Sequence, residues 1–176
     1  IVSWNWKANG AGSSNTDGSI TSTVSVNTTA GFSVGTCASL ATNNDTLGHG
    51  LGAVPKMIMV KNTASTGNWF VYHASVGNNK RLKLNDTVAE GASTVFNSTT
   101  PTSSVFSVGD ANAVNINNGT FVNYLWSSVQ GFSKFGNFVG NGSNDGPYIH
   151  LGFRPAFLII KETSNADDWQ SGTGVC

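Results

Sequence analysis

Short stretches in which apolar and polar residues alternate recur along the whole chain. The alternation is cleanest at Thr23-Val24-Ser25-Val26 and at Trp4-Asn5-Trp6, with glycine, asparagine, serine or proline between one stretch and the next. Such alternation is typical of strands with one buried face, and no segment has the periodicity of an amphipathic helix. The pattern predicts strands over residues 2–6, 20–26, 32–38, 56–61, 69–73, 81–84, 104–108, 121–129, 133–139, 148–151 and 156–161.

Two stretches are continuously apolar instead of alternating. They are residues 57–60 and 157–160, and each follows a proline, Pro55 or Pro155. A strand that is apolar on both sides is expected to be covered on both faces, and a proline is tolerated just before a strand begins. The pattern therefore predicts two equivalent central strands.

These two strands belong to an internal repeat with an offset of 100 residues. Residues 31–69 align with residues 131–169 without a gap and share 11 of 39 positions. Shared turn formers and apolar anchors indicate a repeated architecture. The identical pairs are Gly31/Gly131, Phe32/Phe132, Ser33/Ser133, Asn44/Asn144, Asp45/Asp145, Leu51/Leu151, Gly52/Gly152, Pro55/Pro155, Lys61/Lys161, Thr63/Thr163 and Trp69/Trp169.

An aromatic strand precedes each copy. Residues 1–6 resemble residues 121–126 at an offset of 120, so the first copy carries an insert of about 20 residues, 7–26, expected to be a surface loop with a hairpin arm. No strand is expected after Trp169, which suggests a truncated second copy. We expect a first unit over residues 1–130 and the start of a second over 131–176, or one continuous sandwich.

The composition supports an all-β chain. Asparagine, serine, threonine and glycine supply 81 of the 176 residues, whereas only 18 residues are charged. Residues that suit turns and pleated surfaces are thus abundant, and strong helix formers are scarce. We expect a β-sandwich of the jelly-roll or lectin-like kind, built from two related units.

The charge pattern argues against nucleic acid and membranes as partners. The formal net charge is zero, and no segment approaches the ~20 apolar residues of a membrane span. The one basic cluster, Lys80, Arg81 and Lys83, is interpreted as a solvated edge. Because residue 1 opens inside a strand pattern, we expect a piece of a longer polypeptide.

The cysteines and histidines offer no recognisable motif for a metal site. Cys37 and Cys176 could form one disulfide, although two unpaired thiols are favoured. None of the three histidines has a metal-ligand spacing. His49 and His150 each lie just before a Leu-Gly pair and are interpreted as turn histidines that donate to the backbone.

A calcium site and a hydrolytic site both have little support in the sequence. The Asn43-Asn44-Asp45 and Asn144-Asp145-Gly146 triplets carry oxygen donors that calcium could use, but turn chemistry explains them with fewer assumptions. No nucleophile elbow appears, and Glu90 and Glu162 are the only glutamates, so we expect no enzyme, cofactor or metal.

The aromatic residues could form a sugar-binding platform or a core. Trp69 and Trp169 occupy equivalent positions, and Trp4 and Trp6 point to one side of a predicted strand, as do Tyr124 and Trp126. A core role is favoured for all of them. No ligand-binding residue can be named from this pattern.

A set of longer motifs resembles a β-rich domain of tail-fibre and other virion-associated proteins of bacteriophages, especially marine ones. The motifs are VSWNWKANG at residues 2–10, GHGLGAVPKMIMVKN at 48–62, GNWFVYH at 67–73, GFSKFG at 131–136 and GFRPAF at 152–157. The resemblance implies a structural or adhesion module at the virion surface, without a cofactor and often trimeric. It transfers no functional residue.

These observations give one leading hypothesis and two alternatives. The leading one is a structural and receptor-binding component of a virion, such as a tail fibre, that binds a host cell-surface glycan or receptor and other virion proteins. The first alternative is a carbohydrate-binding, lectin-like module of a secreted or cell-surface adhesin. The second is a capsid-decorating or filament-forming protein. Repeated copies would supply avidity to weak individual contacts.

Overall fold

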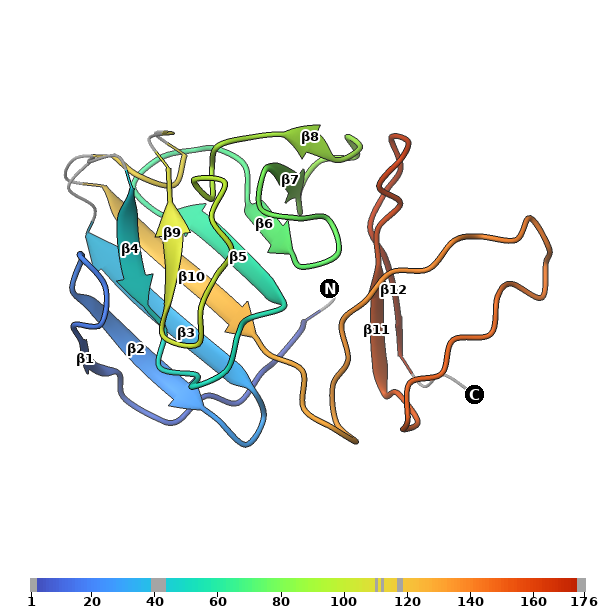
Figure 1. The fold of residues 1–176 in the computed structure, drawn as a ribbon, viewed down its shortest axis with the longest axis horizontal. Coiled ribbons are helices and arrows are strands. Elements are labelled where there is room, and N and C mark those ends of the chain that lie inside the picture. The colour runs from blue at the N-terminus through green and yellow to red at the C-terminus, as the bar shows by residue number, and fades with distance from the viewer. Residues whose placement is uncertain (1–2, 39–43, 110, 112, 117–118, 174–176) are drawn as a thin grey trace.

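The computed structural model describes residues 3–38, 44–109, 111, 113–116 and 119–173, which form twelve strands and no helix (Figure 1). The all-β expectation is therefore confirmed. The strands are β1 (Ser13–Asn15), β2 (Ser22–Asn27), β3 (Phe32–Ala38), β4 (Asp45–Gly48), β5 (Met57–Asn62), β6 (Phe70–His73), β7 (Lys80–Lys83), β8 (Gly91–Ala92), β9 (Val105–Val108), β10 (Thr120–Trp126), β11 (Phe157–Ile160) and β12 (Gln170–Thr173).

The main sheet has eight strands in the order β1-β2-β3-β10-β5-β6-β7-β8, and every neighbouring pair is antiparallel. The strand β10 lies at the centre, paired along its length with β3 on one side and β5 on the other. Its alternating pattern sends Phe121, Asn123 and Leu125 to one face and Tyr124 and Trp126 to the other. The sheet therefore has two faces that must each be covered.

One face is covered by the two-stranded sheet β4–β9 and by the chain on either side of β9 (Figure 1). Ile58 and Val60 on β5 face this layer and are at most 1% exposed. They pack with Phe96 and Phe106 from the covering layer, which are equally buried. This contact is the larger core, and it makes the fold a β-sandwich.

The opposite face is covered less completely. A second cluster gathers Met57, Met59, Val71, Leu82 and Trp126 on this face. Partly buried side chains from the N-terminal segment and from the chain after β10 pack against it. They are Ala8, Phe135 and Trp169. In Figure 1 the hairpin β11–β12 stands beside the sandwich, and residues between β10 and β11 make a wide excursion away from it.

The hairpin β11–β12 repeats the pairing of β5–β6. Met57 pairs with His73 and Val60 with Phe70, and residues 100 positions later, Phe157 with Thr173 and Ile160 with Gln170, pair in the same register. The expectation that no strand follows Trp169 is therefore wrong. A strand needs only backbone donors and acceptors in register, so Gln170-Ser171-Gly172-Thr173 forms one without apolar side chains.

A complete second copy is not confirmed. The strands predicted over residues 133–139 and 148–151 do not form, and the only ladder contact there is the isolated bridge between Val129 and Ser133. Gly136, Gly140 and Gly142 interrupt this stretch, and residues 136–145 are all exposed. Glycine weakens a strand that has no face to bury. The division of the chain after residue 130 stays a prediction.

The central position expected for the second apolar strand is also wrong. Met57 to Val60 are all buried, as predicted, but Leu158 is 37% exposed and no residue of β11 is fully buried. The difference lies in the neighbouring strands. The strand β5 lies between β6 and β10, whereas β12 is the one described strand that pairs with β11.

The N-terminal aromatic segment differs from its prediction in both structure and burial. Its described residues, 3–6, form no strand, and Trp4 and Trp6 are 39% and 42% exposed. Their rings lie against other aromatic rings at the margin of the second face, so they are not core residues. Tyr124 is partly buried and Trp126 is 7% exposed, so the core role is confirmed for Trp126.

The predicted insert forms the hairpin arm that was expected. The strand β1 pairs with β2 and forms one edge of the main sheet. Residues next to the loop enter the core, with Ile20 and Val24 at most 5% exposed. The short strands β1, β4 and β8 were not predicted, because Ser13–Asn15, Asp45–Gly48 and Gly91–Ala92 have little apolar alternation.

Candidate binding groove

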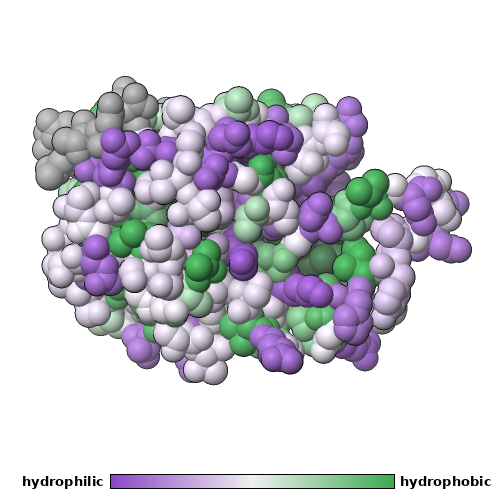
Figure 2. All heavy atoms as spheres, in the orientation of Figure 1, coloured by the Kyte–Doolittle hydropathy of each residue, from purple (hydrophilic) through white to green (hydrophobic). Residues whose placement is uncertain are grey.

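An open groove lies where the hairpin β11–β12 meets the main sheet. Its volume is about 540 Å³, and hydrophobic surface gathers at this junction (Figure 2). The groove receives one wall from the N-terminal segment, one from the chain after β7 and one from the end of the hairpin loop. The lining residues are Trp4, Leu84, Asn85, Asp86, Thr87, Asp168, Trp169 and Gln170.

The Trp169 wall is fixed by hydrogen bonds. The Trp169 Nε1–H group donates to the carbonyl of Lys83 at 2.8 Å, which ties the indole to the end of β7. The hairpin loop is bound to the same region by two backbone bonds, Asp167 N–H to Thr87 C=O at 2.9 Å and Glu90 N–H to the loop carbonyl of residue 163 at 3.0 Å. The hairpin is therefore docked on the β7–β8 connection by its loop.

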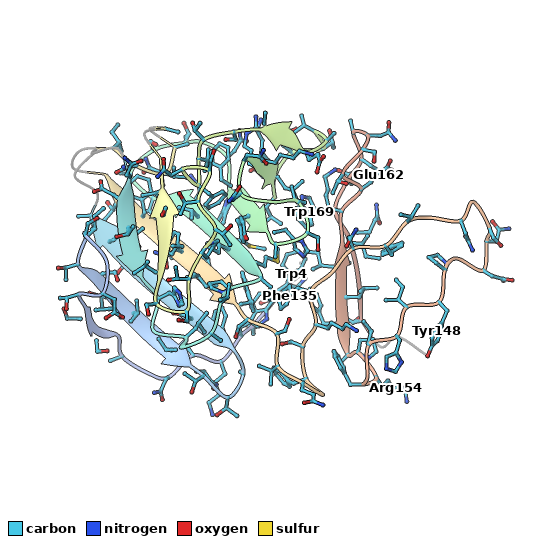
Figure 3. The ribbon with its side chains drawn as sticks, in the orientation of Figure 1. Trp4, Phe135, Tyr148, Arg154, Glu162 and Trp169 are labelled. Carbon is cyan, nitrogen blue, oxygen red and sulfur yellow. The ribbon has the colours of Figure 1, made fainter. Side chains whose placement is uncertain are left out.

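The Trp4 wall is held by ring contacts. The Trp4 ring makes edge contacts with Phe157 at a centroid distance of 5.7 Å and with Trp6 at 6.5 Å. Trp6 in turn lies 5.3 Å from Trp126 of the main sheet. Edge-to-face contacts of this kind hold an indole while leaving part of its surface open. Figure 3 shows Trp4 and Trp169 at the junction of sheet and hairpin.

Polar groups line the rest of the groove. Asp86 accepts a hydrogen bond from Lys83 Nζ at 3.0 Å and from the Val88 N–H group at 3.2 Å. The bond from Lys83, with the backbone bond to Val88, lowers the pKa of Asp86, so this carboxylate stays ionised. Asp168 and Gln170 are exposed beside Trp169 and supply further oxygens and an amide.

Asn85 is held in place by its own bonds. Its side-chain oxygen accepts from the Trp69 N–H group at 2.8 Å, and its amide donates to Asn68 at 3.1 Å. These bonds fix the turn after β7 against the loop between β5 and β6. The groove thus combines two indole surfaces with carboxylate and amide groups on a hydrogen-bonded frame, an arrangement that suits a ligand with both C–H faces and hydroxyls.

The sequence pattern singled out Trp69 and Trp169 as an equivalent pair, but it did not predict the groove. Trp69 and Trp169 hold equivalent positions, yet Trp69 stacks on Tyr124 at 6.1 Å while Trp169 lines the groove. Asn85, Asp86 and Asp168 were missed. The Asn-Asp and Asp-Asp pairs resemble ordinary turn sequences, so only their proximity in the fold reveals them.

The histidines lie elsewhere. His49 is fully buried, with Nδ1 accepting from the Leu51 N–H group at 3.2 Å and Nε2 facing the Thr102 carbonyl at 3.2 Å. This confirms a turn histidine bonded to the backbone. Burial lowers its pKa, against the opposing effects of that carbonyl and of Asp17. His150 is exposed and shows no such arrangement, so the shared interpretation is wrong for it.

Among the candidate calcium ligands, Asp45 forms ordinary side-chain contacts. Asp45 is 6% exposed, accepts from the Ser19 hydroxyl at 3.3 Å and from the Asn115 amide at 3.3 Å. Asn44 takes a positive φ of 68°, as a turn asparagine can. Asn43 lies outside the described residues. Among those that are described, no three His, Cys, Asp or Glu side chains gather as a metal site would require.

The remaining predicted features are also placed. Cys37 is a free buried thiol, and its burial raises its pKa to about 11. Cys176 lies outside the described residues.

The basic cluster on β7 is paired with other side chains and is not merely solvated. Its contacts are Lys80 with Glu90, Lys83 with Asp86 at 3.0 Å, and Arg81 over the ring of Phe70 at 5.9 Å.

The fold and the groove define a class of β-sandwich module with an aromatic groove at its margin. The chain belongs to the family DUF7483, described as a domain of unknown function, which it matches over residues 1–171. No curated protein and no solved structure matches it. Within the part of the chain that the structure describes, no helix is long and apolar enough to cross a membrane.

Proposed function

We propose that this chain is a structural and receptor-binding module of a virion appendage, such as a phage tail fibre, and that the groove binds glycans of the host cell surface. The observation that carries the binding role is the pairing of the Trp4 and Trp169 indoles with the carboxylate and amide groups beside them. The virion setting is supported by the resemblance of the motifs at residues 2–10, 48–62 and 131–136 to tail-fibre domains.

A sugar matches the groove in shape and chemistry. The C–H face of a pyranose packs on an indole surface, and its hydroxyls donate to carboxylates and accept from amides. The chain has no net charge and supplies no strong field, which favours a neutral or weakly charged ligand. An open groove of this size would bind a short segment of a polysaccharide weakly, and several copies in one appendage would supply avidity.

Binding without turnover is the role that the carboxylates favour. Glycoside hydrolysis requires one carboxyl group with a raised pKa to protonate the leaving oxygen. The pKa of Asp86 is lowered by Lys83 instead, so it is suited to accept hydrogen bonds from a ligand. We therefore propose a binding module with no catalytic residue, no cofactor and no resident metal.

The test is binding to an array of purified bacterial lipopolysaccharides, capsular polysaccharides and exopolysaccharides. We expect retention of a subset of these glycans and at least a tenfold loss on Asp168→Ala, which removes a carboxylate without touching β11 or the N-terminal segment. Tyr148→Ala is the control, because Tyr148 is 90% exposed and lies outside the groove.

Two results would count against the proposal. Retention that Asp168→Ala leaves unchanged would place any glycan site away from the groove. No retention of any glycan by the native chain, even when it is displayed in many copies on a bead, would leave the structural role without the receptor-binding one.

A further inference from the structure

The outer edge of β11 is an open strand edge. In the equivalent hairpin, β5 pairs with β6 on one side and with β10 on the other, where Met57 lies opposite Trp126 and Met59 opposite Tyr124. Among the described strands, β11 pairs with β12 alone. The hairpin therefore repeats β5–β6 but lacks the strand that corresponds to β10.

This edge is apolar, which is unusual for an edge that faces solvent. The strand reads Phe157-Leu158-Ile159-Ile160 and carries no charge, proline or bulge. Leu158 is 37% exposed, and the other three are only partly buried. Proteins protect exposed strand edges with charges, prolines or very short strands, and an unprotected apolar edge is a site for strand addition.

The chain contains a segment with the pattern of the missing strand. Residues 3–6, Ser-Trp-Asn-Trp, correspond to residues 123–126 of β10, Asn-Tyr-Leu-Trp, with aromatic rings at the second and fourth positions of each. If this segment paired with β11 as β10 pairs with β5, Trp6 would lie opposite Phe157 and Trp4 opposite Ile159.

The single chain brings both rings of the segment to β11 without a backbone ladder. The rings of Trp4 and Trp6 lie 5.7 Å and 6.0 Å from that of Phe157, yet residues 3–6 form no strand. The following residues are tied to β2, where Lys7 C=O accepts from Asn27 at 3.1 Å and Asn9 N–H donates to Ser25 at 3.0 Å. The rings of the segment contact the hairpin, while the backbone groups of residues 3–6 form no backbone hydrogen bond within the described part of the chain.

We propose that residues 3–6 of a second copy of this chain add to the outer edge of β11 as an antiparallel strand. In the main sheet, the hairpin β5–β6 precedes the aromatic strand β10 along the chain and pairs with it. In a head-to-tail contact, the hairpin β11–β12 of one copy pairs in the same way with the N-terminal aromatic segment of the next copy. The contact joins two different surfaces, so it propagates into a ring or a filament and does not stop at a symmetric dimer.

The proposal is independent of glycan binding. The incoming residues 3–6 replace the chain's own residues 3–6 beside β11, with Trp6 opposite Phe157 and Trp4 opposite Ile159, so an indole still lines the groove. Asp168 is not on the outer edge of β11, and its substitution tests the groove alone. Loss of assembly and loss of glycan retention are therefore separate results.

The experiment uses two complementary variants in sedimentation velocity over a wide range of concentrations. Trp4→Ser/Trp6→Ser removes the rings of the added strand, and Leu158→Lys places a charge on the accepting edge. We expect the native chain to form a concentration-dependent series of oligomers and each variant alone to remain a monomer. An equal mixture of the two has one working contact per pair, so it should form a 1:1 dimer and nothing larger. Tyr148→Ser, which removes an exposed aromatic ring elsewhere, should assemble as the native chain does.

A competing peptide tests the same contact on the native chain, so the result does not depend on a variant that fails to fold. A peptide with the sequence of residues 120–126, flanked by lysines, should bind the native chain, protect the backbone amides of β11 from hydrogen exchange and dissolve the oligomers. A native chain that stays monomeric, or a tryptophan variant that assembles as well as the native chain, would overturn the proposal. Protection, in the monomer, of those β11 amides that point away from β12 would do the same, since the chain's own segment would then fill the edge.

Discussion

Gly31 and Gly131, an identical pair of the repeat, have the same type of backbone conformation in different surroundings. Gly31 and Gly131 both have a positive φ, 63° and 75°, which an L-residue adopts at a cost of about 1 kcal/mol. A Cβ at Gly31 would also lie 2.7 Å from the backbone oxygen of Ser127, whereas a Cβ at Gly131 would meet nothing within 4 Å. The same turn residue is crowded in the first copy and free in the second.

We therefore expect Gly31→Ala to destabilise the chain by about 2–4 kcal/mol, the sum of backbone strain and overpacking, and Gly131→Ala by about 1 kcal/mol at most. Urea unfolding of the two variants measures the difference. Equal losses would mean that the Ser127 carbonyl moves away at little cost, and that the turn at Gly31 is less constrained than it looks.

The buried His49 and the partly buried His73 predict how stability depends on pH. Burial lowers the pKa of His49 and of His73 below 6.5, so the unfolded chain takes up protons before the folded one does. Stability should then be full above pH 7 and should fall as the pH drops from about 6.5 towards the lowered values. Asp86 has a pKa below its ordinary 3.8, so it titrates at more acid pH and does not contribute in this window.

The measurement is the melting temperature between pH 7.5 and pH 5. We expect a decrease in the native chain and a flatter profile in His73→Gln, which removes the partly buried ring without disturbing the His49 turn. A melting temperature that stays constant across this range would show that both rings bind protons in the folded state as readily as in the unfolded one.

At the scale of elements, the hairpin β11–β12 separates what the local sequence decides from what neighbours decide. Its register follows that of β5–β6 because the segments between the innermost paired residues, 61–69 and 161–169, have the same length and each begins with Lys and ends with Trp. Its burial does not follow, because β10 and β7 flank β5–β6, whereas none of the described strands flanks β11–β12. A residue pattern can thus predict that the hairpin forms, but not which neighbouring strands bury it.

The attachment of this hairpin gives a prediction of its own. Trp169→Phe keeps an aromatic ring at this position but loses the hydrogen bond from Nε1–H to the Lys83 carbonyl. The loss should destabilise the docked hairpin by about 1 kcal/mol and make its local opening roughly fivefold more frequent. Hydrogen exchange of the amides in β11 and β12 should report this while the melting temperature changes little.

The matched control is Trp69→Phe, at the equivalent position of the first hairpin. It should leave exchange in β11 and β12 unchanged. If both substitutions had the same effect there, or neither had any, the hairpin would be held by the loop's backbone bonds and not by the indole.

For the whole molecule, the sequence predicted the class of fold and most of the long strands, and the reasons are physical. Strands β3, β5 and β6 have strong alternation or continuous apolar runs, and their bounds lie within one residue of those expected. The short strands were missed because β1, β4 and β8 pair through backbone groups with few apolar side chains. The strand order was beyond a local pattern, since β10 inserts between β3 and β5 from far along the chain.

The groove was beyond a local pattern for the same reason. Trp4 and Trp169 come from opposite ends of the chain, and Asn85 and Asp86 come from its middle. Alternation predicted that Trp4 and Trp6 share one side of a strand, and it placed them in the core. They are partly exposed instead, because residues 3–6 form no strand and lie at the margin of the second face.

The central position of β10 also bears on how the chain folds during synthesis. The strands β3 and β5 emerge from the ribosome first, and β10 follows β5 by roughly 60 residues, a delay of about 3–12 s at ~5–20 residues per second. During that interval the nascent sheet is divided into two halves, each with a vacant edge, and any other aromatic strand nearby could enter the gap. Slow long-range closure of this kind raises the contact order and delays folding. A chain built this way would gain from a chaperone that holds the two halves until their middle strand arrives.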